Sequence, residues 1–228
     1  WIMSVAAGPD IVEDGLVLAL DAGNIRSYPG SGSSWNDISG NSNNGTLTNG
    51  PTFSSADGGS ILLDGTNDYV NGVHNSQLDT TGSMTGACWF KLTDTASDWV
   101  RVLGKGDSTN RTFGLWYNTG SNTFLYQRYG SSNSNVSTTS FTIALNTWWN
   151  IVGTSSGSSH ILYLNGEAVS SGSTGSTFYS STDPYAIGYA GIHSYHQGNV
   201  ANCKIYNRAL TSAEVKQNYN AIKSRFGL

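Results

Sequence analysis

Short apolar runs alternate with clusters of Gly, Asn and Ser over almost the whole chain. Runs of this length, bounded by turn residues, are typical of strands in an all-β sandwich or barrel. The first run is apolar almost throughout, which predicts burial of both of its faces. We predict strands within Gly15–Gly23, Met84–Leu92, Trp99–Gly106, Arg111–Asn118, Thr123–Gly130, Thr147–Ser156, His160–Gly172 and Asn199–Asn207.

One hairpin and one long loop stand out in this pattern. Alternation through Ile161 and Tyr163 runs up to Asn165-Gly166, a dipeptide that supplies two residues at positive φ for a type I′ turn. Between residues 21 and 53 alternation is weak and turn residues are frequent. Recurring apolar anchors in this segment predict an ordered loop that wraps the sandwich, at Tyr28, Trp35, Ile38, Leu47 and Phe53.

The C-terminal segment has the pattern of a helix. Thr211 and Glu214 form a capping box, in which each side chain satisfies a backbone N–H of the first turn. Leu210 before the cap and Val215 inside it can close a hydrophobic staple. An apolar stripe at spacings of four, three and four follows, made of Val215, Tyr219, Ile222 and Phe226.

Composition excludes some partners. Only 11% of the 228 residues are charged, against about 25% in an average protein, but 37% are hydrophobic, including seven Trp and twelve Tyr. We therefore predict a folded protein with long polar loops. The net charge of −4 provides no basic field for phosphates, so nucleic acid is not expected as a partner. Membrane insertion is not expected either, because no apolar run approaches the ~20 residues of a span.

The two cysteines, Cys88 and Cys203, fall in separate predicted strands. A disulfide requires the fold to bring these strands together. The interpretation we favour is a pair of buried free thiols that act as small hydrophobic side chains.

Several motifs together carry a family resemblance. They are LDAGNIRSYPGSGSSWNDISGNSNNGTLTNGPTF, GGSILLDGTNDYV, ILYLNGEAV and GNVANCKIYNRALTSAEVKQNYNA. The chain resembles the concanavalin A-like lectin/glucanase superfamily in its laminin G-like branch, and most resembles stand-alone laminin G-like virion structural proteins of tailed bacteriophages. The resemblance implies an all-β jelly-roll sandwich of two antiparallel sheets with one C-terminal helix. In this family the helix folds back over the sandwich and covers apolar surface that a sheet edge would otherwise expose. The resemblance divides the chain into an N-terminal extension, 1–14, and a single domain, 15–228.

Candidate catalytic residues do not form a recognisable site. Glycosidases of this superfamily need two facing carboxylates, commonly in an E-x-D-x-x-E type motif, which this chain lacks. Glu214 is engaged in the capping box, and the aspartates fall in turns, where Asp is favoured for backbone reasons, at Asp64, Asp68, Asp94, Asp98 and Asp107. His193 and His196 are three residues apart in a predicted loop, where hydrogen bonding is favoured over metal binding. We expect no enzyme activity.

Calcium is the cofactor that the resemblance implies, since laminin G-like sandwiches often bind one ion at a loop rim. The segment WNDISGNSNNGT offers oxygen donors in a Gly-containing loop. The candidate ligands are Asp37, Asn41, Asn43 and Asn44. The alternative is an ordinary turn, because Asn-Gly clusters are common turn formers.

Aromatic residues in two neighbouring predicted strands suggest a sugar-binding surface. Trp116 lies on one face of its strand, and Tyr126 and Arg128 share a face of the next. If these three residues meet on the exposed concave sheet, they form a carbohydrate-binding platform of rings and hydrogen-bond donors. The alternative is that they belong to the core or to a subunit contact.

The resulting hypothesis is a lectin-like adhesion or decoration protein on a virion surface, assembled in the host cytoplasm, with an extracellular location as the alternative. Its partner would be a cell-surface glycan, and self-association into a homo-oligomer would be compatible with the hypothesis. The competing hypothesis is a purely structural virion protein that docks on capsid, tail or fibre proteins without binding sugar.

Overall fold

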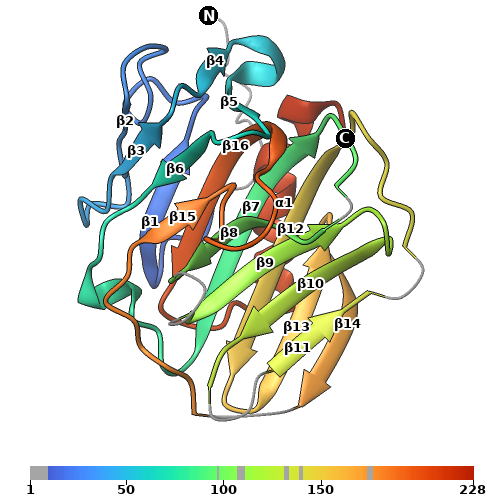
Figure 1. The fold of residues 1–228 in the computed structure, drawn as a ribbon. Coiled ribbons are helices and arrows are strands. Elements are labelled where there is room, and N and C mark those ends of the chain that lie inside the picture. Colours follow the sequence, from blue (N-terminus) through green and yellow to red (C-terminus); the bar gives the residue numbers. More distant parts are fainter. Residues whose placement is uncertain (1–9, 97, 107–110, 131–133, 139–140, 174–176) are drawn as a thin grey trace, which may run out of the picture.

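The computed structural model describes residues 10–96, 98–106, 111–130, 134–138, 141–173 and 177–228. Two eight-stranded antiparallel sheets pack face to face (Figure 1). The predicted all-β sandwich is therefore confirmed. None of the helices described is both long and apolar enough to cross a lipid bilayer.

The sheet that carries the helix is called the back sheet. Its strands follow the order β14 (Glu167–Ser173), β13 (Ser159–Leu164), β12 (Trp148–Ser156), β7 (Met84–Leu92), β16 (Gln197–Tyr206), β5 (Ser60–Asp64) and β4 (Thr52–Ser54). The first strand, β1 (Leu16–Asp21), pairs with the second half of β16. The first and the last strand of the chain therefore lie side by side in this sheet.

The opposite sheet is called the front sheet. Its strands follow the order β11 (Ser134–Ser137), β10 (Thr123–Arg128), β9 (Phe113–Asn118), β8 (Val100–Lys105), β15 (Tyr185–Ile187), β6 (Tyr69–Asn71), β3 (Gly45–Thr48) and β2 (Ser34–Trp35). Because strand side chains alternate between faces, each sheet sends every second residue into the shared core, as Leu115 and Ile151 illustrate.

Local sequence signals account for several elements. Asn165 and Gly166 adopt φ values of 50° and 78°, as the predicted type I′ turn requires. The segment predicted as a wrapping loop is ordered and contains the short strands β2 and β3. Its anchors Tyr28, Trp35 and Leu47 are buried.

The helix α1 spans Ser212–Ile222 and continues as a 3₁₀ turn over Lys223–Phe226; two further 3₁₀ turns span Ala56–Gly58 and Ser76–Leu78. Both halves of the predicted capping box are present, since Glu214 N donates to Thr211 Oγ1 and Thr211 N to Glu214 Oε2. The staple residues Leu210 and Val215 are buried in one cluster.

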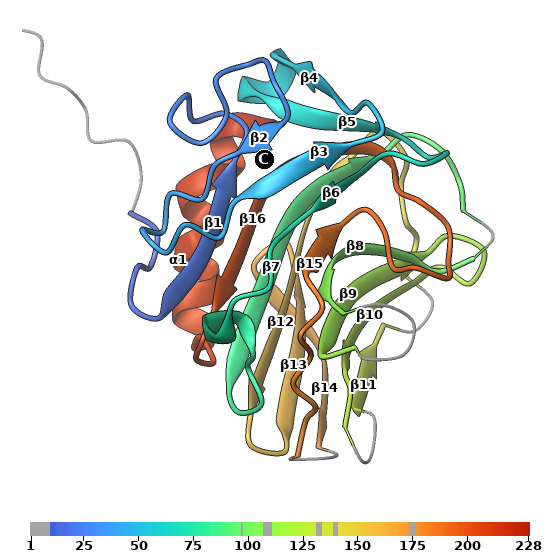
Figure 2. The same cartoon turned by 60° about the vertical axis from the view of Figure 1, so that its left-hand side comes forward.

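The helix folds back over the sandwich, as the resemblance implies, and lies over the outer face of the back sheet (Figure 2). Its partly buried residues Tyr219, Ile222 and Phe226 pack on a cluster formed by Trp89, Trp148 and Ala201, which lie on three adjacent strands. The Trp89 and Tyr219 rings stack with centroids 5.4 Å apart. The stripe is apolar because a sheet face, and not only an edge, needs to be covered there.

Packing also shows how the segment before β1 and the two cysteines are held in the fold. Val12, placed in the predicted extension, is buried beside Val215, and its carbonyl oxygen accepts a hydrogen bond from Tyr206 Oη. Cys88 and Cys203 are direct cross-strand partners, fully buried, and are free thiols with their sulfurs 3.4 Å apart.

Candidate functional site

The outer face of the front sheet carries the main candidate site. Leu115 and Tyr117 of β9 point into the core, so Trp116 between them points outward. Its cross-strand neighbours on this face are Arg101 of β8 and Leu125 of β10.

The predicted platform of Trp116, Tyr126 and Arg128 does not form, and this prediction is wrong. Tyr126 pairs with Leu115, so its ring lies in the core, where Oη and Ser155 Oγ share a 2.6 Å hydrogen bond. Tyr126 and Arg128 are both fully buried.

Arg128 has a structural role instead. Its guanidinium donates to the carbonyl oxygens of Thr80 and Gly82 and lies 4.1 Å from the centroid of the Phe178 ring. These contacts tie β10 to the segment that leads into β7.

Trp116 lies in a hollow of about 380 Å³, which we call the Trp116 groove. Its lining comes from three adjacent strands and from loops beside them: Trp99, Arg111, Trp116, Leu125, Gln127, Tyr129, Asn135 and His193. Most of these side chains are aromatic or carry amides, which is a common lining of small-ligand sites.

The floor of the groove depends on Gly114. A Cβ atom there would lie 2.1 Å from Trp116 Nε1, so only glycine lets the indole lie flat on β9. The indole is 2% exposed, and Nε1 has no hydrogen-bond partner among the described residues. Nε1 is fully buried against Gly114, so the indole forms the floor of the groove through its ring and does not offer its N–H to a ligand.

One wall of the groove is a chain of polar side chains. Gln127 Nε2 donates to Asn135 Oδ1 over 2.6 Å, and Tyr129 Oη donates to Gln127 Oε1. Each amide still has hydrogen-bonding capacity beyond these contacts. Gln127 is half-buried and Asn135 is exposed.

Arg111 and His193 lie over the indole. The Arg111 guanidinium is 5.6 Å from the Trp116 ring centroid and 4.5 Å from that of Tyr129. His193 meets Trp116 edge-on at 5.5 Å and shares a 3.0 Å hydrogen bond between Nδ1 and Asp98 Oδ2. Burial raises the pKa of Tyr129 to about 12, although Arg111 acts against the rise.

A second hollow of about 230 Å³, which we call the Tyr69 hollow, lies on the same face. It is lined by Tyr69, Asn71, Arg101, Gly106, Asp183, Pro184, Ala186, Tyr189, Ala190 and Gly191. The Tyr189 ring stacks on that of Tyr195 with centroids 4.4 Å apart, and its centroid lies 5.2 Å from that of the Tyr69 ring. Arg101 connects the two hollows, because its guanidinium lies 5.6 Å from the Trp116 ring while Nε donates to the Tyr189 carbonyl.

The candidate calcium loop uses both oxygens of its one carboxylate, Asp37, in internal hydrogen bonds. Asp37 Oδ1 accepts from the backbone N–H groups of Ala19 and Ser39, and Oδ2 accepts from Ser39 Oγ and Asn43 N. A carboxylate with four donors has no lone pair left for a cation without breaking these bonds.

The amides of the loop are engaged in part, because Asn43 Oδ1 is buried and has no hydrogen-bond partner among the described residues. Asn44 Oδ1 accepts from Asp37 N, while the Nδ2 groups of Asn41 and Asn43 donate to carbonyls of β1. Within the described residues, no cluster of three or more His, Cys, Asp or Glu side chains is placed to hold a metal. The four residues therefore fit a loop anchor better than a calcium site.

His193 and His196 do not face one common site. His196 is buried in the core, where Nδ1 and Tyr117 Oη share a 3.0 Å hydrogen bond, and burial lowers its pKa to about 4. Only His193 lies in the groove.

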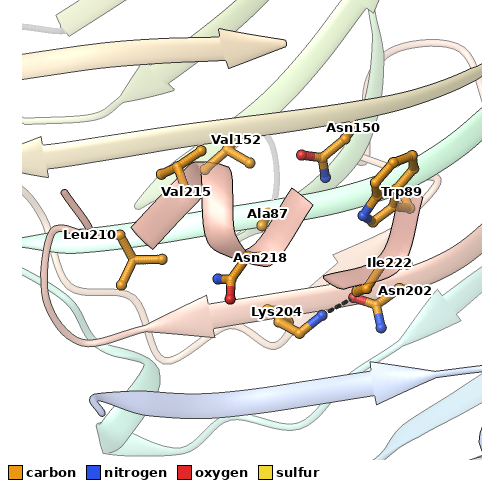
Figure 3. A pocket seen from close by; sticks show the side chains of 10 residues that line it. All are labelled: Ala87, Trp89, Asn150, Val152, Asn202, Lys204, Leu210, Val215, Asn218 and Ile222. Carbon is orange, nitrogen blue, oxygen red and sulfur yellow. Dashed lines mark hydrogen bonds between the residues drawn. The ribbon is translucent and has the colours of Figure 1, made fainter. Parts of the chain in front are cut away.

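A small cavity lies beneath α1 (Figure 3). It is bounded by Trp89, Asn150, Lys204 and Asn218, among other side chains, and its volume of about 10 Å³ is close to that of a single water probe. Lys204 Nζ donates to Asn202 Oδ1 at its edge. The cavity is too small for an organic ligand.

Two of the aspartates predicted to lie in turns come at the end of β5, where Asp64 is the last strand residue and Asp68 follows four positions later. Asp64 Oδ1 accepts from the backbone N–H groups of Thr66, Asn67 and Asp68, which lowers the pKa of Asp64. Burial, together with the Asp64 charge, raises the pKa of Asp68. Both acids line a hollow of about 500 Å³ beside β4 and β5, which shares no residue with the Trp116 groove. Asp107 lies outside the described residues.

Known structures share this fold. The binding domain of Paraclostridial mosquitocidal protein 1 superposes with a TM-score of 0.73 at 17% identity, over 92% of this chain and 52% of that one. Domain 4 of AbnA, an extracellular GH43 arabinanase from Geobacillus stearothermophilus solved with arabinotriose, superposes with a TM-score of 0.72 at 17% identity. The match covers 91% of this chain and 100% of that domain. Trypanosoma rangeli sialidase with the inhibitor DANA superposes with a TM-score of 0.68 at 16% identity, over 94% of this chain and 35% of the sialidase chain.

These identities establish the fold alone, and the chain spans only about half of the toxin chain and a third of the sialidase. No curated protein sequence gives a significant match. A laminin G-like model of the concanavalin A-like lectin/glucanases superfamily matches residues 64–216, well over half of the chain. The protein belongs to the concanavalin A-like lectin/glucanase superfamily.

Proposed function

We propose that the protein is a non-enzymatic glycan-binding adhesion module and that the Trp116 groove holds the sugar. The observation that carries this proposal is the combination of aromatic surface and planar amides in one open hollow. Aromatic rings pack against the apolar faces of sugar rings, and the Gln127 and Asn135 amides can bind hydroxyl groups. The complex of the arabinanase domain with arabinotriose supports a sugar as the ligand class.

The arrangement of the two hollows favours an oligosaccharide over a single sugar. Outer-face positions connect them across the strands, because Gln127 pairs with Gly114, Gly114 with Gly104, and Gly104 with Ala186. Strands are ~4.8 Å apart, so the distance from β10 to β6 is roughly 19 Å. The Trp116 indole lies over Gly114 and the Arg101 side chain over Gly104, so these two side chains form the surface between the hollows.

Binding without cleavage is proposed from the placement of the acids. The described lining of the Trp116 groove contains no carboxylate, and Asp183 is the acid that lines the Tyr69 hollow. Asp183 Oδ2 already accepts from Ser181 Oγ. Retaining glycosidases need two carboxylates about 5 to 5.5 Å apart. We expect no reducing ends to be released from any bound polymer.

The biological setting is a separate part of the proposal. A virion surface rests on the sequence resemblance to phage structural proteins, whereas the similar solved structures are parts of a toxin and of glycosidases. A glycan-binding module suits each of these settings. The purely structural alternative predicts that no glycan binds.

Variants of the exposed amides test the proposal. The double variant Gln127→Ala/Asn135→Ala removes the amide wall, and Gln77→Ala removes an exposed amide from a distant 3₁₀ turn as a matched control. On a glycan array and in titrations with the best ligand, the double variant should bind at least tenfold more weakly, a loss of about 1.4 kcal/mol. The control should bind like the wild type. A wild type that binds no glycan, or an unchanged double variant with unchanged melting temperature, contradicts the proposal.

A further inference from the structure

We propose that the Trp116 groove selects acidic glycans and that Arg111 holds the sugar carboxylate. This inference rests on the proposed function and assigns its ligand class. The shared chemistry is a carboxylate on a sugar ring, whether from a uronic acid or from a sialic acid.

The position of Arg111 is the first support. Its guanidinium lies between two aromatic rings, 4.5 Å from Tyr129 and 5.6 Å from Trp116, directly over the groove. Cation–π contacts hold the planar group in place, and one of its N–H donors is used in a side-chain hydrogen bond to Tyr129. A guanidinium carries five N–H donors, so the remaining ones can serve a planar acceptor.

The charge balance of the groove is the second support. None of the ion pairs within the described residues includes Arg111. The nearby acid Asp98 is already bonded to His193 Nδ1 and to the backbone N–H of Trp99. Arg101, which is 1% exposed, adds a second positive charge beneath the same indole.

A half-buried guanidinium in a hollow whose described lining has no carboxylate favours a carboxylate ligand over a neutral one. Arg binds carboxylates through two parallel N–H···O bonds, and such charge-assisted bonds are about twice as strong as neutral ones. The net charge of −4 opposes an anion only weakly, since charges beyond about 8 Å are screened at physiological salt.

The competing interpretation is that Arg111 only braces Trp116 and Tyr129. In that case its replacement would change stability or affinity for all sugars alike. In our interpretation, replacement changes the preference between acidic and neutral sugars. This difference, and not affinity alone, is the quantity to measure.

Matched ligand pairs provide the test. One arm compares oligogalacturonides with their carboxyl-reduced neutral counterparts, and the other compares sialyllactose with lactose. The proteins are the wild type, Arg111→Gln, Arg111→Lys and, as a charge-matched control on an exposed loop, Arg26→Gln. Dissociation constants are measured at low and at physiological salt, together with melting temperatures.

We expect the wild type and Arg26→Gln to prefer the acidic member of at least one pair by tenfold or more, and more strongly at low salt. Arg111→Gln should lose this preference while it keeps its affinity for the neutral member. Arg111→Lys keeps the positive charge but not the two parallel N–H donors of the guanidinium, so it should keep part of the preference for the acidic ligand. It serves as the second variant if Arg111→Gln does not fold.

Equal binding of acidic and neutral members by the wild type, or an undiminished preference in Arg111→Gln, overturns the inference while the proposed function stands. Binding of neither member of either pair, together with an empty glycan array, overturns both.

Discussion

Replacement of Lys204 by methionine tests how α1 is packed on the back sheet. Lys204 lies on β16 beneath the helix, is 4% exposed, and bonds to Asn202 (Figure 3). Burial lowers its pKa from 10.5 to about 8, although the Asp21 charge acts against the change. Methionine fills a similar volume with a flexible unbranched chain and carries no charge.

The pKa gives the sign and the size of the effect. Because the folded-state value lies below the unfolded one, the unfolded chain holds the proton more tightly, and the free energy of unfolding is reduced below pH 8. This reduction disappears as the pH rises toward 10.5. It amounts to about 3 kcal/mol at pH 7, of which about 1 kcal/mol is regained by pH 9. At pH 7 the variant also leaves Asn202 Oδ1 without its donor, at about 1 to 3 kcal/mol, so the pH slope is the decisive readout.

Urea unfolding at pH 7, 8 and 9 measures this slope. The range stops at pH 9 because tyrosines whose pKa is raised by burial, such as Tyr206 at about 12, destabilise the fold once the unfolded chain ionises near pH 10. Relative to Lys204→Met, the wild type should gain about 1 kcal/mol between pH 7 and 9. The control is Lys216→Met on α1, because the Lys216 side chain is 40% exposed. Parallel slopes for the wild type and Lys204→Met would refute the reasoning.

Three further predictions concern the core, the groove and the loop. Cys88 and Cys203 should both titrate as thiols after denaturation but resist alkylation in the native protein, because both are buried and burial raises the pKa of Cys88. A protein mass lower by two hydrogens, with no titratable thiol, would show a disulfide instead. Gly114→Ala should weaken glycan binding at least tenfold by displacing the Trp116 indole, whereas Gly82→Ala, which meets no atom within 4 Å, should not; equal affinities in titration would contradict this. Asp37→Ala should lower the free energy of unfolding by roughly 3 kcal/mol, since it leaves buried donors unpaired. Chelator should leave the wild-type melting temperature unchanged, and a chelator-induced drop would restore calcium to the loop.

The sequence predicted those features that depend on local chemistry. The capping box at Thr211, the type I′ turn at Asn165-Gly166 and the burial of the first strand all follow from a few neighbouring residues. Alternation also placed Trp116 on the opposite face of β9 from Leu115 and Tyr117.

The platform failed because alternation does not determine register. Trp116 pairs with Leu125, so even-numbered residues of β9 lie opposite odd-numbered residues of β10, and Tyr126 faces the core. A slip of one residue reverses the face of every side chain. The signal that could have identified Gln127 is the turn length between β9 and β10, which sets this register.

The remaining groove residues could not be found from one strand pattern. Arg111 precedes a strand, Tyr129 follows one, and His193 lies in a loop after β15 that folds back over β9. Their proximity results from sheet order, since β15 pairs with β8 although 80 residues separate the two strands. Such contacts depend on topology and not on local propensity.

The indole N–H signal of Trp116 in a ¹H–¹⁵N spectrum, assigned with Trp116→Phe and followed during titration with an oligosaccharide, tests the central claim most directly. Trp35 is an internal control, because its Nε1 also has no partner in the described structure but lies in the core. We predict a saturable shift of the Trp116 signal while the Trp35 signal stays in place. Saturable binding that leaves Trp116 unchanged and shifts the signals of Trp89 and Trp148 beneath the helix would contradict the account.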